Sequence, residues 1–356
     1  MADHHIQVNA EALAAQRVAS ILSLRDSVLN DIQKTSSSNV GAELLADKVG
    51  VITGVDSDIG IGAASLATFA REGARHIYLV DWQKRHILAI IETIKTRFPN
   101  TTLTLIEGDA ADAPFVKSVI DRVINDEGHL DFFFANSGVM ELPGKEKEER
   151  IDDDPGKFLP ELWADVFETS EEDFLAYMRI NAARQASSSP LQAYLVLTHL
   201  PCSKFIALKY ASKAMSLTCP ERGKTLPGGS ILLTSSTAGV KARAGPLAYS
   251  ASNASIVSFA QTGSYEFAGR NVRVNAICPG LIQTEMTAPF LVPNLHGDSG
   301  TPAEGMMNPS LRHGLAHEVA EVAVFLSSSK ASYINGQAIN IDGGWTAGNP
   351  FMPRPM

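Results

Sequence analysis

The segment YSASN, residues 249–253, carries a phenol and a carboxamide that could take part in proton transfer. Tyr249 and Asn253 are four residues apart, so on a helix they would share one face. An unperturbed tyrosine has a pKa near 10, and a nearby cation must lower that pKa before the phenolate can act as a base near neutral pH. Asn253 forms hydrogen bonds but carries no charge. The chemistry open to Tyr249 therefore depends on the groups that the rest of the chain brings to it.

A glycine-rich segment, TGVDSDIGIG at residues 53–62, follows a short β-branched run and precedes a helical pattern. Glycines there let the backbone turn tightly and approach a pyrophosphate, which then lies at the N-terminus of the helix. Asp81 ends the next apolar run, about 20 residues further on, where an acidic side chain accepts the hydroxyls of an adenosine ribose. We therefore predict a dinucleotide site that favours NAD over NADP, because Asp81 would repel a 2′-phosphate. Lys84 and Arg85 lie close enough in the sequence to weaken that preference.

Alternating apolar runs and helical patterns must position these residues. Near-continuously apolar strands are predicted at 48–54, 76–81, 102–109, 130–138, 229–236, 273–280 and 338–344, with helices between them, for example at about 83–97 and 113–127. Strands of this kind, separated by helices, are typical of a parallel sheet that is covered on both faces. The predicted fold class is α/β, a doubly wound parallel seven-stranded sheet of Rossmann type, with an added N-terminal helix and two insertions.

The chain divides into three predicted parts. Residues 1–44 form a helical extension and linker, because apolar residues in 11–34 recur at near-helical spacing and a serine-rich segment follows. Residues 45–349 form the Rossmann domain, and residues 350–356 form a tail. Two segments interrupt the domain: 141–163 is charged and punctuated by proline and glycine, and 185–203 contains two prolines that prevent a continuous helix. The segment 185–203 is either a genuine lobe or an artefact of the gene model.

Several motifs, in order, resemble those of the short-chain dehydrogenase/reductase family, from about residue 47 to about residue 349. The glycine segment resembles the family's cofactor loop, although five residues separate its first two glycines where the family usually has three. GDAAD resembles the segment that contacts adenine, ANSG the segment beneath the cofactor, and ICPGLIQT the loop that holds the nicotinamide carboxamide. The cofactor-binding residues that this resemblance implies are Gly54, Gly60, Ile61, Gly62, Asp81, Asp109, Ala110, Asn136, Ser137, Gly138, Tyr249, Asn253, Pro279, Gly280, Ile282 and Thr284.

The resemblance also implies a set of catalytic residues. Tyr249 would transfer a proton while a hydride passes between the nicotinamide and the carbinol carbon. Ser236 lies thirteen positions before Tyr249, the family's usual spacing for the serine that orients the substrate, and RINAA places Asn181 where the family has a water-holding asparagine. Asn253 stands where the family has a lysine, which binds the nicotinamide ribose and stabilises tyrosinate. Without that charge the pKa of Tyr249 should stay high, which favours ketone reduction over alcohol oxidation.

Three functions remain open at this point. The first is NAD(P)-dependent reduction of a ketone or enone, or oxidation of a secondary alcohol, on a small to medium organic substrate. The second is a cofactor-binding protein without turnover, and the third is an enzyme that uses the same pocket for a non-redox step. Lys241 and Arg243, between Ser236 and Tyr249, could replace the missing cation, although such side chains are ordinarily solvated loop charges.

Composition and net charge restrict the classes of partner that the chain can bind. The net charge of −9 argues against binding to a phosphate backbone, so nucleic acid is not a predicted partner. No apolar run reaches the roughly 20 residues that span a bilayer, and the first residues lack the pattern of a signal peptide, so we expect no membrane partner and a cytoplasmic protein. His313 and His317 have no third ligand near them in the sequence, so no metal is predicted. We expect a small-molecule substrate, and a homodimer or homotetramer because YINGQAINIDGGW resembles the family's C-terminal interface strand.

Overall fold

The computed structural model of the chain describes residues 41–138, 203–287, 308–310 and 312–348, together with residues 23, 26–30, 33–34, 37–38 and 178. Residues 26–30 and 33–34 are helical, in agreement with the helix expected at 11–34. Asn181, the segment 141–163, nearly all of 185–203 and the tail 350–356 lie outside the described residues. What the sequence predicted for them, and the division into three parts, stay predictions.

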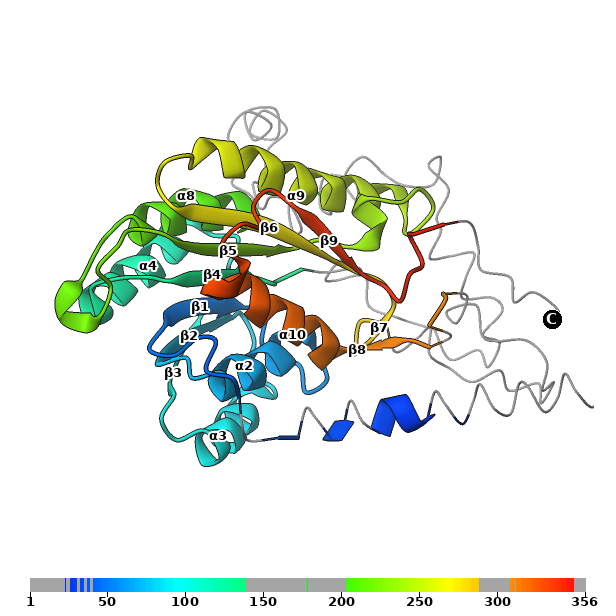
Figure 1. Cartoon of the computed structure of the whole chain (residues 1–356), viewed down its shortest axis with the longest axis horizontal. Coiled ribbons are helices and arrows are strands. Elements are labelled where there is room, and N and C mark those ends of the chain that lie inside the picture. Colours follow the sequence, from blue (N-terminus) through cyan, green and yellow to red (C-terminus); the bar gives the residue numbers. More distant parts are fainter. Residues whose placement is uncertain are drawn as a thin grey trace, which may run out of the picture.

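A seven-stranded sheet forms the centre of the molecule, and every neighbouring pair in it is parallel. Its order is β3-β2-β1-β4-β5-β6-β9 (Figure 1). The strands are β1 (Val49–Thr53), β2 (His76–Asp81), β3 (Thr102–Glu107), β4 (Phe132–Ala135), β5 (Gly229–Thr234), β6 (Val272–Pro279) and β9 (Ala338–Ile341). A separate two-stranded sheet pairs β7 (Ile282–Gln283) with β8 (Gly314–Leu315). The predicted doubly wound seven-stranded parallel sheet is confirmed.

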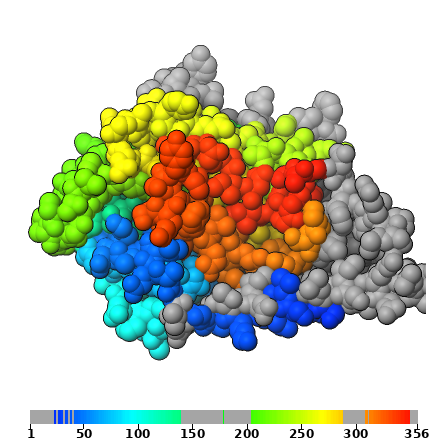
Figure 2. Space-filling view, in the orientation of Figure 1, coloured from blue at the N-terminus to red at the C-terminus, as the bar shows by residue number. Residues whose placement is uncertain are grey.

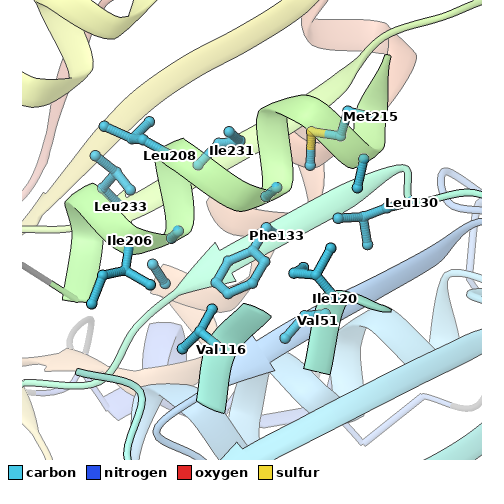
Figure 3. Packing of buried hydrophobic residues seen from close by; sticks show 14 of the residues in the cluster. Val51, Val116, Ile120, Leu130, Phe133, Ile206, Leu208, Met215, Ile231 and Leu233 are labelled. Carbon is cyan, nitrogen blue, oxygen red and sulfur yellow. The ribbon is translucent and has the colours of Figure 1, made fainter. Parts of the chain in front are cut away.

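Helices cover both faces of the large sheet (Figure 1). On one face, α2 (Ile61–Arg71), α3 (Ile87–Arg97) and α10 (Ala316–Ser327) contribute to one buried apolar cluster. On the other, α4 (Ala113–Glu127), α8 (Ser203–Met215) and α9 (Leu247–Glu266) contribute to a second cluster. Figure 3 shows the Phe133 ring of β4 between side chains of α4 and α8. The strands are apolar throughout because both of their faces are buried.

Short 3₁₀ turns complete the described elements: η2 (Pro220–Arg222), η3 (Thr237–Gly239) and η6 (Ser329–Ala331). Helix α3 begins at Ile87, four residues after the predicted start near 83. The intervening residues follow the end of β2 and are drawn toward the glycine segment by hydrogen bonds described below. Helix boundaries of this kind depend on capping groups that lie far away in the sequence.

The direction in which the chain adds strands reverses between β1 and β4. In open parallel sheets, ligands bind in the crevice beyond the carboxyl ends of the strands at such a reversal point. Gly54 follows β1 there, Asn136 follows β4, Ser236 lies just beyond β5, and Asp81 and Pro279 end β2 and β6. The fold therefore brings the residues singled out by the sequence to one edge of the sheet.

The C-terminal segment packs back on the first half of the chain. Helix α10 lies against α2, and Figure 2 shows the segment from α10 to β9, in orange and red, across the middle of the face. Cys219 and Cys278 are free and buried, as expected for small apolar side chains in a core. Among the helices formed by the described residues, none has the length and apolar character that a bilayer crossing needs.

One close contact in the sheet yields a stability prediction. Gly50 of β1 is paired with Phe132 of β4, and a Cβ at position 50 would lie 2.1 Å from the Phe132 ring. We expect Gly50→Ala to lower the free energy of unfolding by about 1–3 kcal/mol through overpacking. Denaturant unfolding would measure this loss.

Two further variants test whether the clash with Phe132 causes this loss of stability. Gly348→Ala should change stability little, because a Cβ there would have no neighbour within 4 Å among the described residues. Gly50→Ala should cost less stability in a Phe132→Leu background than in the wild type, because the smaller side chain leaves room for the new methyl group. An additive double variant would contradict the proposed clash.

Candidate active site

The glycine segment forms a tight turn between β1 and α2. Gly54 has a φ of +74°, which favours glycine, and a Cβ on Gly62 would lie 1.9 Å from the Gly54 carbonyl oxygen. Gly60 is the N-cap residue of α2 and, having no side chain, makes no capping hydrogen bond to the backbone N–H groups that follow it. These N–H groups carry the positive end of the helix dipole and are suited to bind an anion. The predicted residues Gly54, Gly60, Ile61 and Gly62 therefore form one turn at the sheet edge.

Ser57 supplies a second indication that this turn receives a ligand. Its hydroxyl is buried and has no hydrogen-bond partner among the described residues, and it lies next to the position that a Cβ on Gly60 would occupy. Buried polar groups without a partner are rare in folded proteins. The pyrophosphate of a dinucleotide fits these three features together: a backbone turn that excludes side chains, a helix start without a capping side chain, and a hydroxyl without a partner.

Asp81 holds the glycine turn in place. One carboxylate oxygen accepts hydrogen bonds from the backbone N–H groups of Val55 at 2.8 Å and Asp56 at 2.9 Å, and the other accepts from Gln83 at 3.2 Å. The side chain is only 8% exposed. Lys84 forms an ion pair with Glu107 of β3.

The segments after β3 and β4 form the adjoining part of the site. Asp109 accepts a hydrogen bond from the Ala111 backbone at 2.8 Å, which fixes the turn that also contains Ala110. The Thr53 hydroxyl accepts from the backbone N–H groups of Asn136 and Ser137, at 3.1 Å each. Together these contacts order the ends of β3 and β4.

Asn136 joins three strands at this edge. Its Nδ2 donates to the Gly54 carbonyl oxygen at 2.9 Å, and its Oδ1 accepts from the Thr234 hydroxyl of β5 at 3.1 Å. Gly138 is the last described residue of this segment. Asn136 and Ser137, which were predicted to lie beneath the cofactor, therefore adjoin the glycine turn.

Tyr249 lies in the first turn of α9, close to Ser236. Ser236 is the N-cap of η3, where its hydroxyl accepts from the Ala238 backbone at 3.1 Å. The turn is held against α9 by the Ser235 hydroxyl, which donates to the Asn253 carbonyl oxygen at 2.8 Å. This packing places Ser236 within hydrogen-bond reach of the Tyr249 side chain.

The pKa of Tyr249 lies above its ordinary value. Burial is the largest cause, and hydrogen bonds with Ser236 and Asn253 offset it only in part. Asn253 is 4% exposed, and its Nδ2 donates to the Tyr249 backbone carbonyl one turn earlier, at 2.9 Å. Both side chains that lower this pKa are neutral.

The two loop cations proposed as replacements do not supply a charge to Tyr249. The Lys241 ammonium donates to the Trp345 carbonyl oxygen at 2.7 Å and lies 4.7 Å from the centre of the Trp345 ring. Arg243 is exposed and has a left-handed backbone with a φ of +60°. Within the described part of the chain, no cation contributes to the pKa shift of Tyr249.

The segment after β6 contains the remaining predicted residues. Gly280 packs against Asp342, where a Cβ would lie 2.8 Å from the Asp342 Cβ. Ile282 is buried in β7, and the Thr284 backbone N–H donates to the Thr287 hydroxyl at 3.0 Å. Thr284 is also buried, and its own hydroxyl lies 3.2 Å from that of Thr287. Pro279 ends β6 at the same edge of the sheet.

Comparison with known families agrees with this geometry. Residues 48–171 match the family described as short chain dehydrogenase, and residues 205–346 match the family described as Enoyl-(Acyl carrier protein) reductase. The chain belongs to the short-chain dehydrogenase/reductase family. The two matches together take in the glycine turn, the sheet edge and the Tyr249 helix.

Named relatives of this short-chain dehydrogenase/reductase match most of its length. The 3-oxoacyl-acyl-carrier-protein reductase FabG of Thermotoga maritima is 28% identical over 303 residues, which are 84% of this chain and 98% of that protein. Levodione reductase of Leifsonia aquatica is 26% identical over 303 residues, which are 85% of this chain and 95% of that protein. A crystal structure of levodione reductase is 25% identical, with a TM-score of 0.64, and covers 85% of this chain and 99% of that one.

Two residues of this short-chain dehydrogenase/reductase site were missed by sequence reasoning. Lys204 of α8 is 1% exposed, and its ammonium donates to the Ser137 carbonyl oxygen. The signal was present, because Lys204 shares a helical face with the apolar Leu208 and Ala211. Asp56 of the glycine turn is the second, and no local pattern marks its contacts.

The unused Ser57 hydroxyl leads to a binding prediction. We expect Ser57→Ala to weaken NAD binding about tenfold, because a hydrogen bond to a charged phosphate is worth about 1.5–3 kcal/mol. The melting temperature should not fall, since the hydroxyl has no partner to lose. Titration calorimetry and thermal unfolding measure the two effects.

Thr53→Val is the matched control for this experiment. It also removes one hydroxyl from the glycine turn, but that hydroxyl accepts two backbone hydrogen bonds. The melting temperature should therefore fall in Thr53→Val. Unchanged NAD affinity in Ser57→Ala would remove Ser57 from the cofactor site.

Proposed function

We propose that the protein is an NAD(P)-dependent oxidoreductase that reduces a ketone or enone, or oxidises a secondary alcohol, on a small to medium organic substrate. The observation that carries the proposal is the position of Tyr249 and Ser236 at the same sheet edge as the uncapped glycine turn. The names of the relatives support a carbonyl or carbinol substrate, since they include a 3-oxoacyl reductase and levodione reductase.

The proposed roles rest on the positions of Tyr249 and Ser236 and on the family's motifs. When bound, the nicotinamide supplies the hydride that reduces the carbonyl carbon. Ser236 orients the substrate oxygen through a hydrogen bond, and the Tyr249 hydroxyl donates its proton to that oxygen. Asn181 would hold a water in the relay, and the Ile282 backbone and the Thr284 hydroxyl would orient the nicotinamide carboxamide.

Asn253 determines whether ketone reduction or alcohol oxidation is the faster direction of the proposed reaction. Its side chain is neutral and already donates to the Tyr249 carbonyl, so it leaves the pKa of Tyr249 high. Reduction uses the neutral phenol, which is abundant below that pKa, whereas oxidation requires tyrosinate. We therefore propose an enzyme that favours reduction and oxidises alcohols poorly near neutral pH.

NAD is the proposed cofactor, with NADP as the alternative. The buried Asp81 carboxylate at the end of β2 supports this choice, because its charge repels a 2′-phosphate. We further propose a cytoplasmic homodimer or homotetramer.

Asn253→Lys tests the proposed function. A cation one helical turn after Tyr249 should lower the Tyr249 pKa, so that the rising limb of alcohol oxidation moves to lower pH. We expect oxidation near neutral pH to increase about 10²-fold or more, and ketone reduction to increase less. The pH–rate profiles with a generic secondary alcohol and its ketone, followed by nicotinamide absorbance, measure this change.

Two controls accompany that variant. Ala254→Lys adds the same charge to the same helix at an exposed position, and it should leave the profile unchanged. Tyr249→Phe in the Asn253→Lys background should abolish the gain. The proposal of hydride transfer would fail on the following result: the wild type is folded and binds NAD but turns over neither substrate, and Asn253→Lys gives no gain in activity.

A further inference from the structure

Asp56 lies in the glycine turn, but its carboxylate accepts hydrogen bonds from the start of a different helix, α3. Its backbone N–H donates to Asp81, as described above. Its own side chain accepts hydrogen bonds from three backbone N–H groups: Arg85 at 2.9 Å, His86 at 2.7 Å and Ile87 at 2.8 Å. Burial acts to raise the Asp56 pKa, but these hydrogen bonds outweigh it and lower the pKa below its ordinary value. Asp56 is therefore ionised at neutral pH.

The three N–H groups lead into α3: Ile87 is its first residue, His86 is its N-cap, and Arg85 precedes the cap. The helix contains eleven residues, its N-cap His86 makes no side-chain capping bond, and its first turn contains no acidic residue. Free N–H groups at a helix start attract an anion, because they carry the positive end of the helix dipole. Asp56 supplies that anion from a position about thirty residues earlier in the chain.

This anion lies beside the acid proposed to bind the adenosine ribose. Asp81 ends β2, Asp56 is hydrogen-bonded to it, and Arg85 to Ile87 follow it by a few residues. A 2′-phosphate on that ribose would need N–H donors or a cation nearby to offset its charge. The N–H donors at the start of α3 are bound by Asp56, and Lys84 is paired with Glu107.

We infer that Asp56 is a specificity-determining residue, whose carboxylate occupies the anion position at the start of α3 and so excludes the 2′-phosphate of NADP. The inference rests on the proposed function, since it assumes that the glycine turn binds a dinucleotide. It goes further by assigning the discrimination to an intramolecular anion in addition to Asp81.

Asp56→Asn is the first test. The amide oxygen can still accept the two hydrogen bonds that one carboxylate oxygen accepts from His86 and Ile87, but the charge is removed. We expect the ratio of the NADP to the NAD dissociation constant to fall at least about tenfold, the size of a Coulomb term between close charges near a protein surface. Titration calorimetry with NAD and NADP, and with AMP and adenosine 2′,5′-bisphosphate, measures the change without turnover.

Asp58→Asn is the matched control. It removes one negative charge from the same turn, but the Asp58 side chain is 58% exposed and pairs with the His86 ring at 2.9 Å rather than with the α3 backbone. The ratio should change less than about twofold, because exposed charges are screened. An equal effect of Asp58→Asn and Asp56→Asn would overturn the inference, since net charge alone would then explain it.

Asp56→Ser is a second neutral variant. Its hydroxyl is a shorter hydrogen-bond acceptor, so the charge is removed without the introduction of a side-chain amide. If both Asp56 variants remain folded by thermal unfolding and bind NAD with an unchanged NADP to NAD ratio, the inference is wrong. If the wild type binds neither nucleotide, it is the proposed function that fails.

Discussion

The turn from β1 into α2 depends on a close approach between two stretches of backbone, which leaves no room for a side chain between them. Only glycine fits at position 62, because a Cβ would lie 1.9 Å from the Gly54 carbonyl oxygen. That same carbonyl accepts the Asn136 side chain, so one peptide group joins the glycine turn to β4. The contact directs the uncapped start of α2 into the crevice at the strand reversal. The rest of the site is arranged around this junction.

The adenosine side of the site is organised by two carboxylates with different partners. Asp81 binds the backbone of the glycine turn, and Asp56, from that turn, binds the backbone at the start of α3. Each acid accepts hydrogen bonds from backbone N–H groups, so both contribute to stability. Under the proposed function, their combined negative charge would also favour NAD over NADP at this end of the site.

In the proposed mechanism, one neutral residue changes the balance between the two directions of the reaction without changing the fold. Asn253 packs well: it is buried, it bonds the preceding turn of α9, and its carbonyl holds the turn that carries Ser236. What it lacks is charge, and burial then keeps the Tyr249 pKa high. A high pKa leaves proton donation intact and weakens proton acceptance, so the two directions of one reaction are affected unequally.

The sequence by itself determined the strands, the parallel sheet and the glycine turn, because these follow from local apolar runs and from residues that only one backbone conformation accepts. The resemblance of its motifs to those of the short-chain dehydrogenase/reductase family pointed to Tyr249 and Ser236, and the distance from the glycine segment pointed to Asp81. The tertiary structure alone decided the side-chain partners. Asp56 reaches the start of α3, and Lys241 turns toward Trp345, 104 positions later in the chain. Such contacts join segments that are distant in sequence, and their formation depends on how helices and strands pack, which no local pattern encodes.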